Sequence, residues 1–256
     1  MRITTIQSNI IWEDINSNLF SFGEKILLIP EKSTDLIILP EMFNTGFTMN
    51  AKKMAEKMDG PTLTWMRDLS AKKDAVITGS LIIEDQAKYY NRLIWMQPDG
   101  ECRYYNKRHL FRMSEENHIY TQGHDRLIVD WRGWKICPMI CYDLRFPVWC
   151  RNRNDYDLLI YVANWPERRN YPWKQLLIAR AIENISYVAG VNRIGEDGNS
   201  IYHSGDTAII DYKGEVVSHT KPHEENIETL QLSMESLKLF RENFPAWKDA
   251  DEFLLQ

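Results

Sequence analysis

Two kinds of apolar pattern alternate along this chain. Continuous apolar runs predict strands, several of them buried on both faces, at residues 35–40, 75–84, 134–140, 157–164 and 186–193. Over residues 15–29 and 59–74 the apolar positions instead recur every three or four residues, which predicts helices. The second of these helices is expected to begin at Gly60-Pro61-Thr62.

The remaining segments complete a mixed pattern. Residues 91–107 and 207–219 are predicted hairpins that turn at residues 98–100 and 212–214, and residues 2–8 and 226–233 are predicted strands. Further helices are expected over residues 146–154, 173–184 and 234–242. Because strands and helices interleave throughout, we expect one α/β domain, residues 1–256, in which helices cover sheets.

Composition narrows the functional class. The 256 residues are 44% hydrophobic and 26% charged, as in a globular protein, and a net charge of -5 argues against a broad nucleic-acid-binding face. No apolar run approaches the roughly 20 residues that span a bilayer, so we expect no membrane segment. The first residues lack the apolar core of a secretory signal, and Cys102, Cys137, Cys141 and Cys150 form no CxxC pair. We therefore expect a cytoplasmic protein with reduced thiols.

Three reactive side chains each follow a predicted strand. Glu41 comes after the run at 35–40, Lys107 ends the 91–107 hairpin, and Cys141 ends the run at 134–140. Strand ends in layered α/β folds converge on a crevice, so these residues are expected to meet. Taken singly, each is more often a solvated turn residue or an inert core thiol.

As a set, the three have a chemical use. A thiol attacks a carbonyl carbon as the thiolate, and a carboxylate within reach can take its proton and later return it to a leaving amine. An ammonium beside them stabilises the oxyanion of a tetrahedral intermediate. A helix that starts just after Cys141 would add backbone N–H groups at its positive end. The sequence thus predicts a cysteine hydrolase.

The motifs around these residues resemble those of a known family. The stretches LPEMFNTGF, YNKRHLF and ICYDLRFP are similar, in this order, to the Glu, Lys and Cys motif regions of the nitrilase superfamily of carbon–nitrogen hydrolases. ANWPERR and the later VAGVNR extend the resemblance over nearly the whole chain. Such likeness implies an αββα sandwich of four layers, a homodimer, no metal and no organic cofactor.

Within the superfamily, the chain looks most like the bacterial ω-amidase branch, which hydrolyses the terminal amides of 2-oxoglutaramate and 2-oxosuccinamate. The resemblance implies that Glu41 is the general base and acid, Lys107 the oxyanion-stabilising cation and Cys141 the nucleophile. It also implies that the backbone N–H of Tyr142 joins the oxyanion hole. A second glutamate follows the lysine in the family; Glu116 is preferred here, and Glu115 is the alternative.

The small-molecule substrate would need further contacts. An ω-amide of a dicarboxylate carries an anion at its far end, and a guanidinium matches a carboxylate in a bidentate way. Arg145 is the first candidate, its alternative role being a structural ion pair with Asp143 or another acid, and Arg168 and Arg169 are second choices. Phe43, Phe146 and Trp165 flank the motif regions and are expected either to line the pocket or to belong to the core.

Other functions stay open. A nitrilase or an N-carbamoyl amide hydrolase would use the same nucleophile, and a non-catalytic binding protein could keep the same fold. His109 beside Lys107 invites a Cys–His hydrolase, although a structural histidine is the more frequent role. Asp143 is expected to fix the turn after Cys141 through backbone hydrogen bonds. The histidines show no metal-ligand spacing, so no metal site is expected.

Overall fold

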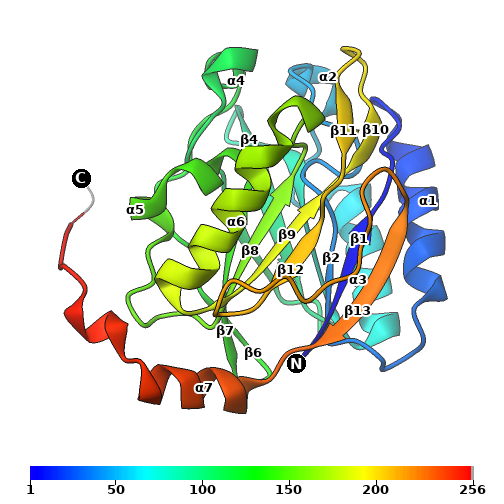
Figure 1. Ribbon diagram of the computed structural model, residues 1–256. Coiled ribbons are helices and arrows are strands. Elements are labelled where there is room, and N and C mark those ends of the chain that lie inside the picture. The colour runs from blue at the N-terminus through cyan, green and yellow to red at the C-terminus, as the bar shows by residue number, and fades with distance from the viewer. Residues whose placement is uncertain (255–256) are drawn as a thin grey trace.

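The computed structural model describes residues 1–254, so the last two residues of the predicted domain lie outside the described part. Two large sheets form its framework (Figure 1). In spatial order, the first sheet contains β13 (Asn226–Gln231), β1 (Arg2–Gln7), β2 (Leu36–Ile38), β3 (Val76–Asp85), β4 (Lys88–Met96) and β5 (Cys102–Asn106). The second contains β12 (Ala208–Ile210), β9 (Tyr187–Asn192), β8 (Leu158–Ala163), β7 (Trp134–Ile140) and β6 (Val129–Trp131).

Each sheet has a parallel centre and antiparallel edges. Strands β1, β2 and β3 run parallel in the first sheet, as do β7, β8 and β9 in the second. The β10 (Ile194–Glu196) and β11 (Tyr202–Ser204) strands pair as a separate small hairpin. The carboxyl ends of the parallel strands are therefore the edge at which loop residues from both sheets can meet.

The helices complete the layers. The first sheet is covered by α1 (Ile15–Leu28) and α3 (Pro61–Lys73), and the second by α6 (Asn170–Asn184), as Figure 1 shows. The shorter helices are α2 (Ala51–Met54), α4 (Glu116–Ile119), α5 (Pro147–Cys150) and α7 (Met234–Asn243). The short 3₁₀ helices are η1 (Arg112–Ser114), η2 (Cys141–Arg145), η3 (Glu167–Arg169) and η4 (Ala246–Asp249). The result is the αββα sandwich that the sequence predicted.

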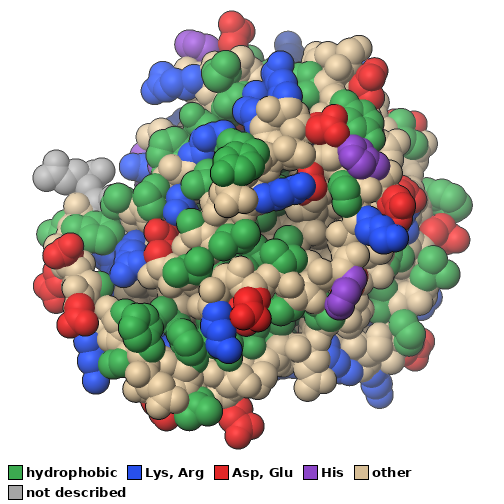
Figure 2. All heavy atoms as spheres, in the orientation of Figure 1, with side chains coloured by type: hydrophobic (Ala, Val, Ile, Leu, Met, Phe, Trp, Pro, Cys, Tyr) green, Lys and Arg blue, Asp and Glu red, His purple; other side chains and the backbone are tan. Residues whose placement is uncertain are grey.

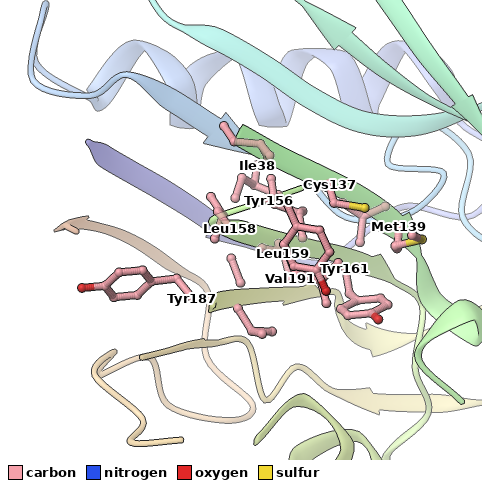
Figure 3. Packing of buried hydrophobic residues seen from close by; sticks show 14 of the residues in the cluster. Ile38, Cys137, Met139, Tyr156, Leu158, Leu159, Tyr161, Tyr187 and Val191 are labelled. Carbon is pink, nitrogen blue, oxygen red and sulfur yellow. The ribbon is translucent and has the colours of Figure 1, made fainter. Parts of the chain in front are cut away.

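Alternation along the strands explains why two cores form. In β2, Leu36 and Ile38 face the opposite sheet, whereas Ile37 between them packs with Phe22 and Ile26 of α1. Successive side chains of a strand point to opposite faces, so an all-apolar strand serves both layers. Figure 3 shows part of the inter-sheet core, in which Leu158 of the second sheet lies on the side of Ile38 of the first sheet.

Most predicted elements are present, and the larger differences are these. The helix expected over residues 146–154 is wrong beyond Cys150, where only the single-turn α5 forms. There the side chain of Asn152 bonds to the backbone of Asp155 and Tyr156, and such local bonds compete with helix. The second arm of the 207–219 hairpin pairs at only one bridge, Ile210 with Val216. The β10–β11 hairpin had no prediction.

The surface adds two findings. On the face shown in Figure 2, basic and acidic side chains are interspersed with apolar ones, and no broad patch carries one sign of charge. Within residues 1–254, no helix combines the length and the hydropathy that crossing a bilayer requires.

Candidate active site

A cavity of about 350 Å³ opens at one end of the sandwich. Glu41, Lys107 and Cys141 all line it, although 66 residues separate the first two in the chain. Glu41 follows β2, Lys107 follows β5 and Cys141 follows β7. The structure thus brings together the three reactive side chains that the sequence placed at strand ends. Figure 1 shows α2, α4 and the β10–β11 hairpin at this same end of the molecule.

Glu41 and Lys107 form a buried ion pair. The Lys107 Nζ donates to Glu41 Oε1 at 2.9 Å, and the Glu41 Oε2 accepts from the backbone N of Asn164 at 2.9 Å. Both side chains are almost fully removed from solvent, with exposed fractions of 1% for Lys107 and 0% for Glu41. In such surroundings an ion pair is weakly screened, so the two groups hold each other in place.

Glu116 contacts the far side of the lysine. Both of its carboxylate oxygens accept from Lys107 Nζ at 3.0 Å, and Oε2 also accepts from the backbone N of Phe111. Glu115 is exposed, with a positive φ of 59° at the start of α4. The structure therefore places Glu116, the preferred of the two glutamates, against Lys107. Glu116 is fully buried and does not line the cavity, so it contacts the lysine and not the cavity space.

Charge in this cluster shifts proton affinities. Although burial acts to lower it, the carboxylates of Glu116 and Glu41 raise the pKa of Lys107 above its usual range. Burial, and then the Glu41 carboxylate, raises the pKa of the Cys141 thiol well above its ordinary value, against the opposing effect of Lys107. The lysine is therefore charged and the cysteine is a thiol at neutral pH.

The backbone at Cys141 is unusual. Its φ is +43°, in the left-handed region that residues other than glycine seldom adopt. Strain of this kind collects at functional sites, where the surrounding structure enforces it. The enforcing group is Asp143, whose Oδ2 accepts from the backbone N of Ile140 at 3.1 Å and from the Tyr105 hydroxyl at 2.8 Å. The expectation that Asp143 fixes this turn is confirmed.

The turn begins as the short 3₁₀ helix η2, which includes Cys141 itself, and not as a helix that starts after it. Tyr142 is the second residue of η2, and the first N–H groups of a helix have no partner within it. Its side chain lines the cavity and lies edge to face with Phe111, ring centroids 5.0 Å apart.

Three guanidinium groups line the cavity, those of Arg145, Arg168 and Arg169. Among residues 1–254 none of the three has a carboxylate within ion-pair distance. Asp143 instead bonds to His109, so the alternative of an Arg145–Asp143 ion pair is wrong. Arg145 lies over the ring of Trp165, 5.0 Å from its centroid. Burial, together with neighbouring Arg168, lowers the pKa of Arg169.

Of the three aromatic side chains considered for the pocket, one lines the cavity and two do not. Trp165 lines the cavity, and its indole N–H donates to the backbone O of Arg169 at 2.7 Å. Phe43 is fully buried between Phe22 and Trp65 in the helix-side core, so the prediction that it lines the pocket is wrong. Phe146 does not line the cavity either. It stacks on the ring of His109 at 3.8 Å between centroids.

His109 has a structural role. Its Nδ1 and its backbone N both contact Asp143 Oδ1, at 2.8 Å and 3.0 Å, and it does not line the cavity. A Cys–His pairing with Cys141 therefore has no support. Within the described residues, no group of three or more His, Cys, Asp and Glu side chains is placed to hold a metal ion.

Several cavity residues were not predicted from the sequence. Phe47 lies four residues beyond Phe43 and places its ring 5.0 Å from Lys107 Nζ. Asn164 binds the Glu41 carboxylate, and Trp12 and His203 come from the β1–α1 connection and from β11. Asn164 directly follows β8, and this was the one sequence feature that could have pointed to it, because the ends of parallel strands share an edge of the sheet.

Comparison with known proteins agrees with this geometry. The sequence profile described as carbon-nitrogen hydrolase matches residues 2–242.

The chain belongs to the carbon-nitrogen hydrolase family.

Individual members of the carbon-nitrogen hydrolase family are similar over most or all of the chain. "Omega-amidase YafV" of Escherichia coli strain K12 is 45% identical over 255 residues, which cover 100% of this chain and 98% of that protein. The "2-oxoglutaramate amidase" of Bacillus subtilis strain 168 is 31% identical over 224 residues, 85% of each chain. The crystal structure of XC1258 from Xanthomonas campestris, a CN-hydrolase superfamily protein, matches with a TM-score of 0.98 and 44% identity, covering 100% of this chain and 99% of that one.

Proposed function

We propose that this protein is an ω-amidase that hydrolyses the terminal amide of 2-oxo dicarboxylate monoamides to the 2-oxo acid and ammonia. One observation carries the proposal: a small cavity holds the Glu41–Lys107 pair and Cys141 together with guanidinium groups that have no ion-pair partner among residues 1–254. The cavity volume, about 350 Å³, lies at the lower end of the range for ligand sites, which suits a small substrate. The names of the two amidase relatives point to the same substrate class.

In the first half of the proposed reaction, the Cys141 sulfur attacks the amide carbon while its proton passes to Glu41. The carbonyl electron pair moves to oxygen, and the resulting oxyanion is stabilised by the Lys107 ammonium and the backbone N–H of Tyr142. The C–N bond then breaks, and the leaving nitrogen takes the proton from Glu41 and departs as ammonia. A thioester on Cys141 remains.

In the second half, water attacks the thioester carbon. Glu41, again ionised, takes a proton from the water, the C–S bond breaks, and the proton returns to the sulfur. The raised pKa of Cys141 fits this scheme, because the thiolate then forms only when Glu41 receives the proton during attack. Glu116 acts through the lysine, which it helps to position.

We assign the far carboxylate of the substrate to Arg145. Its guanidinium has no carboxylate partner among residues 1–254 and lies over Trp165, an arrangement that leaves its N–H fork available to an anion. Arg145→Ala should raise KM steeply for 2-oxoglutaramate and much less for a neutral amide. Arg103→Ala, a surface arginine paired with Glu101, is the matched control and should change neither. Equal losses on both substrates would count against the assignment.

A substrate panel tests the function itself. 2-Oxoglutaramate, succinamate, a simple nitrile and N-carbamoyl-β-alanine separate an ω-amidase from a nitrilase and from an N-carbamoyl amide hydrolase, the enzymes that share this nucleophile. Intact-mass measurement after mixing with substrate should detect an acyl group on wild-type protein and none on Cys141→Ala. No hydrolysis of any panel member, with no acyl adduct, would favour a non-catalytic binding protein.

We further propose that the chain is a single domain over residues 1–256 and, on the family resemblance, that two copies pair across a two-fold axis. From the sequence features given above, we also propose that the protein works in the cytoplasm without binding nucleic acid. The first two points are tested by limited proteolysis and by the molar mass from light scattering on a size-exclusion column.

A further inference from the structure

Asn91, in the middle of β4, binds both glutamates of the cluster at once. It is fully buried, and its Nδ2 donates to Glu41 Oε1 at 2.8 Å and to Glu116 Oε1 at 3.3 Å. The same two oxygens accept from Lys107 Nζ at 2.9 Å and 3.0 Å. Two donor nitrogens and two acceptor oxygens thus form a closed four-membered ring of hydrogen bonds.

A second contact ties Asn91 to the lysine itself. The backbone O of Asn91 accepts from the backbone N of Lys107 at 2.9 Å, which continues the pairing of β4 with β5 past the end of β5. One residue therefore fixes the backbone from which the ammonium projects and also the two carboxylates that flank it. Asn91 does not line the cavity, so it has no direct path to a substrate.

The chemistry of the amide group explains why an asparagine suits position 91. An asparagine NH₂ supplies two N–H donors and no charge, so it satisfies one oxygen of each glutamate and leaves the net charge of the cluster unchanged. The Lys107 ammonium lies between the two carboxyl groups, so the cluster balances one cationic group against two acidic ones. An aspartate here would add a third carboxyl group, and a lysine would add a second ammonium, so either would disturb this balance.

The ring of hydrogen bonds also determines which oxygen of Glu41 can accept a further hydrogen bond. Its Oε1 is occupied by Lys107 and Asn91, whereas Oε2 accepts only from the backbone N of Asn164 among the described residues. A carboxylate oxygen accepts about two hydrogen bonds, so the free acceptor position of Glu41 is on Oε2.

We propose that Asn91 is a positioning residue that keeps Glu41 ionised and directs the proton of Cys141 to Oε2. The proposal rests on the function proposed above, in which Glu41 is the general base. A hydrogen bond to an ionised carboxylate favours the ionised form, so loss of this donor should move the acidic limb of the reaction to higher pH. A rise of about one pH unit corresponds to a tenfold change in proton affinity.

Asn91→Ala and Asn91→Asp test the proposal through the pH dependence of kcat. In Asn91→Ala the acidic limb should move to higher pH by about one unit, so that kcat falls about tenfold at any fixed pH on that limb and changes little on the plateau above it. Asn91→Asp should shift the limb further, because a third carboxyl group adds like charge. KM should stay within about twofold of wild type, since Asn91 makes no contact with the cavity.

Asn44→Ala is the matched control. Asn44 is also buried, and its Nδ2 also bridges a carboxylate, donating to Glu56 Oε1 and to the Thr62 hydroxyl, both outside the cavity lining. This variant loses a comparable buried amide, so its pH limb should match that of wild type. A lower kcat with an unmoved acidic limb in both Asn91 variants, an equal shift in Asn44→Ala, or a loss that appears in KM would overturn the proposal.

A substrate-free measurement separates this proposal from the proposed function. The rate of Cys141 alkylation by iodoacetamide also depends on transfer of the thiol proton to Glu41, so its acidic limb should move upward in the same Asn91 variants. An unmoved alkylation limb would overturn the role of Asn91. A wild-type protein that hydrolyses no ω-amide, yet shows the shifted limb in the variants, would instead refute the proposed function alone.

Discussion

Replacing Lys107 by methionine removes one positive charge from between two buried carboxylates. The methionine keeps the length of the apolar stem, so the loss is chiefly that of the ammonium and its bonds to Glu41 and Glu116 at 2.9 and 3.0 Å. Removing one partner of a buried ion pair typically lowers the free energy of unfolding by about 3–5 kcal/mol, because a charge is left buried without compensation.

The pH dependence of this loss identifies its cause. Without the ammonium, burial and mutual repulsion raise the folded-state pKa of the two carboxyl groups above the unfolded value of about 4.3. Below the unfolded pKa both states are protonated and the deficit is smallest. As the pH rises from there towards the folded-state pKa, the deficit grows by up to about 1.4 kcal/mol per pH unit for each proton retained. Between pH 5 and pH 8 it should therefore widen by up to about 4 kcal/mol for one retained proton.

Urea unfolding followed by circular dichroism at pH 5, 6, 7 and 8 measures this difference against wild type. Lys73→Met is the control: Lys73 is also buried, but within the described part of the chain it donates only to the backbone O atoms of Leu27 and Ile29. Its deficit should be nearly constant over the same range. If the deficit of Lys107→Met were the same at pH 5 and pH 8, the two carboxylates would not be charged in the native protein and the electrostatic reasoning would fail.

Three further predictions follow from single contacts. His109→Ala should keep the amidase activity within about tenfold while lowering stability, since the imidazole binds a turn and not the cavity; complete loss of turnover in folded protein would restore the Cys–His alternative. Gly198→Ala would place a methyl carbon 2.4 Å from the indole of Trp12, a cavity residue, so KM should rise with little change in the rate of acyl-enzyme formation at saturation, read by rapid-quench mass measurement. Glu41→Gln removes a charge that raises the pKa of Cys141, so thiolate absorbance should appear at lower pH than in wild type; an unchanged titration would contradict that cause.

The sequence by itself determined the layers and the reactive strand ends. An apolar run such as residues 35–40 predicts a strand covered on both faces, whether by helices or by another sheet, and its end carries Glu41 to the shared edge of the parallel strands; the αββα layering itself came from the family resemblance. The motifs around Glu41, Lys107 and Cys141 added the family. These features are local, since each depends on a few consecutive residues and on the period of the pattern.

The tertiary structure decided which side chains share the cavity. Phe43 and Phe47 both follow Glu41 within six residues, and only the path of that loop directs Phe47 to Lys107 and Phe43 into the core. Asn91 is the first residue of the hairpin predicted over residues 91–107, and it donates a hydrogen bond to Glu41, 50 positions earlier in the sequence. Such contacts depend on the register between strands and on the packing of distant segments. The apolar period of a single strand gives no information about either.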